Sequence, residues 1–320
     1  MAKKLFDFQD GEQLEIPVLI KSADVRIAKN GKKFIAFTFE DESGQITGKY
    51  WNASEPDIER FQTGKVVHLK GKRERYQGNP QIKIYQLKLV DAAEQDAAAY
   101  VPHAPEKKAT MQDELQSYVF EITNADWSRV VRTLLKKNGA KFFEAPAAKT
   151  NHHAFEGGLA YHTLSILKMA KSVSDQYPQL NRSLLYAGAI LHDMGKVIEL
   201  TGPISTTYSL AGNLIGHIVL IDEEIVLACQ ELKIDIYSEN MLLLRHVVLA
   251  HHGLLEYGSP ERPKIMEAEV LHDLDDMDAS ITMMSTALQH TDAGEYTERL
   301  FAMDGRTFYR PHDKPQSHDE

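Results

Sequence analysis

Apolar and polar residues alternate in short runs over the first 90 residues, the pattern typical of half-buried β-strands. The runs are rich in Val, Ile and Phe, and turn-forming pairs such as Asn30-Gly31 separate them. The alternation changes phase between Ile84 and Leu87, which predicts a β-bulge near Tyr85 and Gln86. A more helical segment, Glu55–Phe61, lies between the third and fourth runs. The predicted strands are Glu15–Ala28, Lys33–Phe39, Gln45–Trp51, Val66–Arg75 and Gln81–Val90.

Five short strands and one helix fit a small OB-type β-barrel, which we assign to residues 1–90. Residues 91–110 contain two prolines and no apolar periodicity, so we expect a linker that begins as a short helix before Pro102. Helical spacing then predicts an all-α bundle over residues 111–300, followed by a tail over 301–320. The chain is thus a multidomain β + α protein. The predicted helices are Ala125–Asn138 (closed by Gly139), Gly157–Gln176, Arg182–Leu191, Ser209–Leu232, Ser238–His251 and Arg262–His290.

Charge is distributed unevenly along the chain. The net charge is −10, yet residues 1–90 carry 16 Lys and Arg against 12 Asp and Glu. A basic first domain and an acidic second domain suggest different tasks. Cys229 is the only cysteine, which excludes an internal disulfide framework and fits a reducing cytoplasm. We find no signal peptide and no apolar run long enough to span a bilayer, so no membrane partner is expected.

The basic barrel carries aromatic residues among its cations, a combination that holds single-stranded nucleic acid by stacking and charge. Many strand aromatics are instead core residues, and many strand lysines only add solubility. We therefore propose a set of residues that together form one nucleic-acid-binding face of the barrel, and not individual contacts. Its members are Lys33, Phe37, Trp51, Lys72, Arg73, Arg75, Tyr76 and Tyr85, with Lys32, Phe34, Lys49 and Tyr50 as further candidates.

A cluster of chemistry-bearing residues begins at His192-Asp193, where an apolar helical run stops and Gly195-Lys196 follows. Imidazole and carboxylate suit a divalent metal that activates water, and a lysine beside them could meet a phosphate oxygen. Antiparallel helices can bring such residues from several helices into one bundle core. The other members are His162, His217, His251, His252, Asp275 and Asp278, of which the two aspartates share a helix face.

The order H…HD…H…HH…D, with Gly-Lys after the His-Asp pair and Asp-x-x-Asp-Ala near the end, resembles the HD-domain superfamily of metal-dependent phosphohydrolases over roughly residues 150–290. An OB-type barrel joined to such a domain is similar to the YhaM-type bacterial 3′-to-5′ exoribonucleases, over nearly the whole chain. This resemblance implies a first metal bound by His162, His192, Asp193 and Asp275. It also implies that Asp193 bridges to a second metal held by His217, His251 and His252, and that Lys196 meets a substrate phosphate.

Four residues are expected around the ligands of this site. Asp278, and His272 one turn before Asp275, would orient the ligands from outside. His152 and His153 precede the first ligand helix, where a substrate contact and a structural role both stay open.

We therefore expect a metal-dependent 3′-to-5′ exoribonuclease that acts on single-stranded RNA and releases nucleoside 5′-monophosphates. Single-stranded DNA is a further candidate substrate, since no residue visibly reads a 2′-hydroxyl. His192, Asp193 and Lys196 would be catalytic, with one or two divalent ions; Mn²⁺ is preferred, and iron, cobalt or nickel also suit N/O donors.

Two alternatives stay open: an HD-type hydrolase of nucleotides or cyclic dinucleotides, and a non-catalytic RNA-binding protein. The barrel counts against the first, because a small substrate needs no module that holds a strand. The near-complete ligand set counts against the second, because unused buried polar groups are costly. The sequence does not set the oligomeric state.

Overall fold

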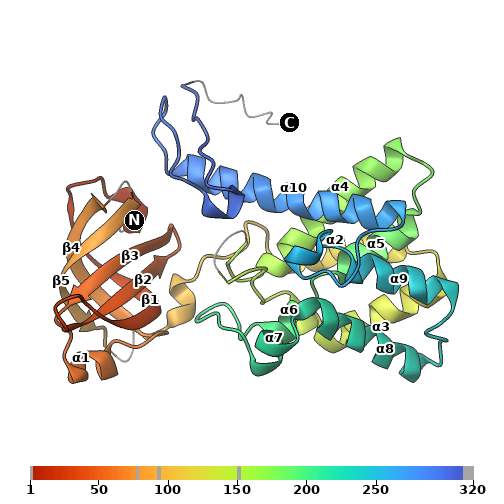
Figure 1. The fold of residues 1–320 in the computed structure, drawn as a ribbon, viewed down its shortest axis with the longest axis horizontal. Coiled ribbons are helices and arrows are strands. Elements are labelled where there is room, and N and C mark those ends of the chain that lie inside the picture. The colour runs from red at the N-terminus through yellow and green to blue at the C-terminus, as the bar shows by residue number, and fades with distance from the viewer. Residues whose placement is uncertain (1–2, 77–78, 92–94, 150–152, 313–320) are drawn as a thin grey trace. The chain divides into compact units, whose positions relative to one another are not determined.

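The computed structural model describes residues 3–76, 79–91, 95–149 and 153–312 (Figure 1). The chain divides into two compact units. One unit contains the described part of residues 1–103 and 286–320, and the other contains residues 104–285. The first is built on a closed β-barrel and the second is helical, which confirms the fold class predicted from the sequence.

The barrel has five strands in the closed order β1-β2-β3-β5-β4. Only the β3–β5 pairing is parallel among these neighbours. A short helix α1 (Glu55–Arg60), capped by Ser54, connects β3 to β4. The strands are β1 (Gln13–Ile27), β2 (Lys33–Asp41), β3 (Gly44–Trp51), β4 (Val66–Tyr76) and β5 (Asn79–Leu89).

The predicted bulge is confirmed, because Lys70 pairs with Gln86 while its neighbour Gly71 pairs with Ile84, leaving Tyr85 as the extra residue. A second irregularity occurs in β1 at Lys21. Inward-facing aliphatic and aromatic side chains fill the barrel, and the most completely buried include Val18, Ile20, Ile35, Phe39 and Leu69.

The helical unit is arranged around α5, whose residues Ser183–Leu191 are all buried and which packs against α3, α4 and α9. Its central position puts the residues that follow α5 inside the bundle. The helices are α2 (Lys108–Phe120), α3 (Ala125–Phe142), α4 (Gly158–Gln176), α5 (Arg182–Leu191), α6 (Lys196–Glu199), α7 (Leu210–Leu214), α8 (His217–Leu232), α9 (Glu239–Leu249) and α10 (Met266–Gln289).

Two helix predictions were wrong in detail. The predicted helix Ser209–Leu232 is two helices, because Gly216 adopts a positive φ of 82° that ends α7 and lets α8 begin at His217. Helix α3 passes through Gly139 and ends at Phe142, whose buried side chain supplies packing that outweighs the weak helix propensity of glycine.

Short 3-10 turns occupy the connections, at η1 (Leu5–Asp7), η3 (Ala97–Tyr100), η4 (Leu255–Tyr257) and η5 (Phe301–Met303). The turn η3 is the short helical segment expected before Pro102. After α10 the chain folds back on itself, with bridges between Tyr296 and Tyr309 and between Leu300 and Arg306. Among the described residues, no helix is long and apolar enough to cross a membrane.

Candidate metal centre and nucleic-acid interface

His192 and Asp193 lie at the C-terminal end of helix α5, in the middle of the helical unit. Asn181 caps its first turn by accepting from the backbone N–H of Leu184, and His192 is the C-cap. The run between them is apolar, so the helix is buried on all sides and both functional residues are at most 1% exposed. A buried carboxylate is costly unless it is compensated, so the partners of Asp193 define the site.

The two carboxylate oxygens of Asp193 face two groups of histidines. Oδ1 lies 3.4 Å from Nε2 of His217 and 3.7 Å from Nε2 of His251. Oδ2 lies 3.6 Å from Nε2 of His162 and 3.5 Å from Nε2 of His192. Burial alone would raise the pKa of Asp193, but Lys196 and the imidazoles outweigh burial and hold the pKa well below its ordinary value.

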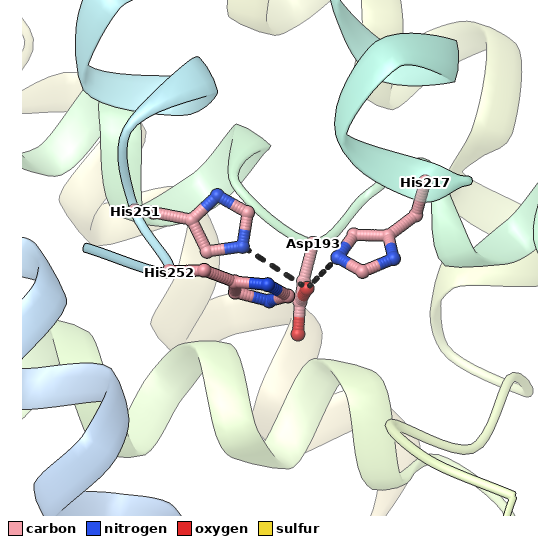
Figure 2. A group of neighbouring side chains, drawn as sticks. All are labelled: Asp193, His217, His251 and His252. Carbon is pink, nitrogen blue, oxygen red and sulfur yellow. Dashed lines mark ion pairs between the residues drawn. The ribbon is translucent and has the colours of Figure 1, made fainter. Parts of the chain in front are cut away.

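The Oδ1 side contains Asp193, His217, His251 and His252, drawn in Figure 2. The rings of His217 and His251 point toward the carboxylate from opposite sides, and His252 lies close to His251 with ring centroids 4.4 Å apart. Burial, with His251 and His217 adding to it, lowers the pKa of His252 to about 4. His252 is therefore neutral near pH 7, as metal ligation requires.

The Oδ2 side adds Asp275 from α10. Its Oδ1 lies 3.1 Å from Nε2 of His162 and 4.0 Å from Nε2 of His192. Burial opposes protonation of His162, but hydrogen bonds to Asp275 and Asp278 outweigh burial and raise its pKa to about 9. The structure thus brings together His162, His192, Asp193 and Asp275, the residues that the family resemblance assigns to a first metal.

Three of these rings are oriented through their other nitrogen by a backbone carbonyl. Nδ1 of His192, His251 and His252 donates to the carbonyls of Ala189, Val248 and Tyr257, at 2.8, 2.7 and 2.7 Å respectively. A carbonyl can only accept, so Nδ1 carries the proton and Nε2 offers its lone pair to the centre. Such outer hydrogen bonds are the usual means of fixing the tautomer of a metal-binding histidine.

The donor set fits a divalent cation. Nε2 of His192, His217 and His251 and Oδ1 of Asp193 are buried and have no hydrogen-bond partner among the described residues, although buried polar atoms normally have one. Unpartnered lone pairs that converge from several helices on one carboxylate are what an N/O metal site requires. Imidazole and carboxylate suit several first-row ions, so the donors define a divalent-metal site without selecting its ion.

Lys196 also reaches the centre, since its Nζ lies 2.6 Å from Oδ2 of Asp193. Burial opposes the charge of Lys196, but Asp193 outweighs burial and raises the pKa of the lysine. Lys196 also lines a cavity of about 460 Å³, together with His217, His252 and Asp275. The predicted metal centre is therefore accessible from a space large enough for a small organic group.

Outer residues hold the ligands in place. Asp278 accepts a hydrogen bond from Nδ1 of His162 at 2.6 Å and also contacts Ser165 and His153, the latter at 2.8 Å. His272 contacts the backbone oxygen of His251 through Nδ1 at 3.0 Å. The contacts of Asp278 and His272 suit the orienting positions expected for them. His152 lies outside the described residues.

Sequence reasoning missed Glu199. Its Oε1 lies 3.1 Å from both the backbone nitrogen and Nδ1 of His217, so one carboxylate oxygen fixes this ring and the first turn of α8. In the sequence, Glu199 is marked only by its position one turn after Lys196. Such a spacing of a lysine and a glutamate is too common to identify a functional residue.

Gly195 makes room for His217, which leads to a prediction. A Cβ at position 195 would lie 2.2 Å from the backbone oxygen of His217, and backbone cannot swing aside as a side chain can. Gly195→Ala should therefore displace His217, lower the melting temperature and reduce the expected hydrolysis about 5- to 150-fold, since overpacking costs about 1–3 kcal/mol and 1.36 kcal/mol changes a rate tenfold. Gly139→Ala is the matched control because its Cβ would meet nothing within 4 Å. Equal activity and melting temperature for Gly195→Ala and the wild type would contradict the prediction.

The barrel has a separate groove of about 370 Å³, lined by Lys49, Trp51, Tyr76, Lys83 and neighbouring side chains. The ammonium of Lys49 lies 5.8 Å from the ring of Trp51 and 5.1 Å from the ring of Tyr76. Trp51 and Tyr76 are 56% and 53% exposed, which is unusual for large aromatic residues. Exposed rings beside ammonium groups can stack on bases and pair with phosphates.

Two predicted contacts on the barrel were wrong. Phe37 is 1% exposed because the alternation of β2 turns it into the barrel core. Arg73 is also buried, and its guanidinium donates to the backbone oxygen of Phe8 at 2.8 Å and pairs with Asp10. Both side chains therefore contribute to the barrel structure.

The other predicted barrel contacts are partly or largely accessible. Tyr85 is 48% exposed at the bulge, and Lys72 is half-buried. Lys33 pairs with Glu55, and Arg75 pairs with Asp10, at 2.6 Å in each case. Lys33 and Arg75 therefore have acidic neighbours with which a phosphate would compete.

Residues 18–90 match the family described as "OB-fold nucleic acid binding domain", and residues 159–280 match "HD domain". Together with the closed barrel and the buried His/Asp centre, these matches define a metal-dependent phosphohydrolase of the HD class with an OB-fold module.

Similarity to named relatives extends over nearly their whole length. The chain is 47% identical over 312 residues to "3'-5' exoribonuclease YhaM" of Listeria monocytogenes serotype 4b, covering 97% of this chain and 99% of that protein. The proteins of the same name from Listeria welshimeri and Listeria innocua are 47% and 46% identical with the same coverage. The chain belongs to the YhaM family.

Proposed function

We propose that this protein is a metal-dependent 3′-to-5′ exoribonuclease that hydrolyses single-stranded RNA to nucleoside 5′-monophosphates. The observation that carries the proposal is the buried carboxylate of Asp193, whose two oxygens face two groups of histidines beside an open cavity. The names of the relatives support the direction and the substrate. Single-stranded DNA stays a candidate second substrate.

The proposed ligands are those that the resemblance to HD domains implies. His162, His192, Asp193 and Asp275 would hold one ion, and Asp193, His217, His251 and His252 a second. A divalent ion held there supplies Lewis acidity, which lowers the pKa of water and offsets negative charge on the scissile phosphate. Manganese is our preferred ion, with iron, cobalt and nickel as alternatives.

The protein's own groups position the reactants. Asp193 and the inward Nε2 atoms fix the donor geometry, and the Nδ1 hydrogen bonds keep it fixed. Lys196, whose charge is held at the cavity wall by Asp193, would contact a phosphate oxygen and stabilise the charge that builds up there. Burial shields Asp193, His192 and His251, which are at most 1% exposed, from bulk water.

The two parts of the chain would divide the work. We propose that residues 1–90 hold the RNA strand, residues 91–110 link the two domains, and residues 111–300 carry hydrolysis, with a tail over 301–320. We also propose a cytoplasmic location, because a single buried cysteine suits a reducing compartment.

The decisive test uses metal-stripped protein and single-stranded RNA labelled at its 5′ end, incubated with manganese, magnesium or no metal. We expect a manganese-dependent ladder that shortens from the 3′ end, with mononucleotides released. RNA binding without shortening under either metal would refute the proposal and would favour nucleotide or cyclic-dinucleotide substrates.

The barrel groove gives a second prediction. Trp51→Ala combined with Tyr76→Ala should weaken binding of a long RNA strand by about 1–3 kcal/mol for each lost base contact. Cleavage of a dinucleotide, which offers no strand beyond its single phosphodiester for the barrel to hold, should change little. Tyr177→Ala is the control, because Tyr177 is 47% exposed on the helical unit. Filter-binding constants would test the prediction, and unchanged affinity in the double variant would refute the assigned role of the groove.

A further inference from the structure

The cavity beside the metal centre has a buried end and an exposed mouth. At the buried end, the side chains of Lys196, His217 and Asp275 are only 12%, 12% and 17% exposed. At the mouth, Tyr208 and Tyr257 line the same cavity and are 45% and 66% exposed. The cavity is therefore lined by charged and imidazole side chains at its buried end and by two tyrosine rings at its mouth.

Both tyrosines are fixed to the centre through the backbone. The carbonyl of Tyr257 accepts the hydrogen bond from Nδ1 of His252 at 2.7 Å, so the turn that carries this ring also orients a proposed ligand. Tyr208 pairs in a β-bridge with Leu200, and Leu200 directly follows the helix that contains Lys196 and Glu199. The mouth and the metal centre are thus positioned by the same short segments.

One further cation lies at the mouth. The ammonium of Lys149 is 6.0 Å from the ring centroid of Tyr208, and Lys149 is exposed. Asp276 lines the same cavity and brings an opposing charge. An aromatic wall beside one ammonium suits the flat, uncharged ring of a nucleotide. It suits another anion, in addition to a phosphate at the buried end, less well.

We propose that Tyr208 and Tyr257 are positioning residues that stack on the terminal nucleobase of the RNA, while its phosphodiester occupies the buried end of the cavity. This inference rests on the proposed exoribonuclease function and identifies which part of the substrate meets which wall. Ring faces accept every base, so the arrangement supports removal of successive nucleotides without sequence preference.

The test compares two RNA substrates with the full-length protein and manganese. One is an ordinary 5′-labelled strand, and the other carries an abasic ribose at its 3′-terminal nucleotide. For the wild type, loss of the base should reduce kcat/KM for the first cleavage about 5- to 150-fold, the range measured for base–aromatic stacking. For the variant with both Tyr208→Ala and Tyr257→Ala, removal of the terminal base should lower kcat/KM less than about twofold, because the stacking partners are already absent.

Matched variants separate stacking from other roles. The variant with both Tyr208→Phe and Tyr257→Phe should behave as the wild type, because it keeps the ring faces. In the alanine variant, the loss of kcat/KM on ordinary RNA should appear mainly as a higher KM. Tyr237→Ala, at a tyrosine 74% exposed elsewhere on the helical unit, should leave both substrates unaffected. Equal melting temperatures for all these variants are expected, since none of the altered tyrosines is buried.

The outcomes distinguish this inference from the function on which it rests. Suppose that the wild type cleaves ordinary RNA normally, and that the alanine variant loses as much kcat/KM on the abasic strand as the wild type does. This result would overturn the stacking assignment and leave the exoribonuclease function standing. Equal loss in the phenylalanine and alanine variants would also overturn it, because the hydroxyl groups would then be responsible. Absence of any cleavage by the wild type would refute the exoribonuclease function, and the stacking assignment with it.

Discussion

Asp193→Ala is expected to reduce RNA hydrolysis on the order of 10³-fold or more, since metal charge stabilisation is worth several kcal/mol and each 1.36 kcal/mol changes a rate tenfold. Asp193 faces four buried or half-buried rings of the centre, namely His162, His192, His217 and His251. Its removal should therefore release metal from both sides of the site. RNA binding should be nearly unchanged, because the barrel groove is built from other residues.

Hydrolysis would be measured with the 5′-labelled strand and binding by fluorescence anisotropy without added metal. The control is Asp273→Ala, which removes an exposed carboxylate from α10. Binding of manganese should raise the melting temperature of the wild type and of this control, but hardly that of Asp193→Ala. Residual hydrolysis within tenfold of the wild type in Asp193→Ala would contradict the central role of this carboxylate.

Glu40→Ala is expected to destabilise the barrel by about 3–5 kcal/mol, the usual cost of removing one partner from a buried ion pair. Glu40 is fully buried, lies 3.1 Å from Nζ of Lys21, and accepts from Nε2 of Gln45 at 2.7 Å. Lys21, itself 8% exposed, would lose this compensating carboxylate while remaining inside the barrel. Urea unfolding followed by circular dichroism and tryptophan fluorescence would measure the shift.

Two comparisons show whether burial is the reason. Lys21→Met with Glu40→Leu removes both charges and should recover most of the lost stability, because apolar residues of similar size often replace a buried pair without cost. Glu15→Ala breaks the exposed pair with Lys70 on the same barrel and should hardly move the unfolding midpoint, since exposed pairs contribute little. A midpoint for Glu40→Ala equal to that of Glu15→Ala would refute the argument.

The arrangement of the metal centre could be predicted because its residue types are rare and ordered. His162, His192-Asp193, His217 and His251-His252 stand on or beside separate helices in the order typical of HD domains. Their convergence follows once the helices form a bundle. The bulge at Tyr85 was also visible, since one extra residue in a strand moves every later side chain to the opposite face.

What stayed hidden depends on contacts between distant segments. Phe37 and Arg73 have the residue types of a nucleic-acid surface. The structure shows that Phe37 lies in the closed barrel and that Arg73 is covered by the segment before β1, to which it donates at Phe8. Glu199 gains its role through α8, which packs against α6. Gly216 was overlooked because glycine is tolerated within apolar helices, whereas here its positive φ separates two of them.

The hydrogen bonds that aim the histidine rings differ in how far they reach along the chain. His192 and His251 each use the carbonyl three residues earlier, so a single helical turn determines the direction of the ring. His217 depends on Glu199, 18 residues away on another helix. Local opening of the segment between α6 and α8 would release His217 while His192 and His251 stay aimed. Of these three rings, His217 should therefore be the first to lose its orientation under mild heat or denaturant.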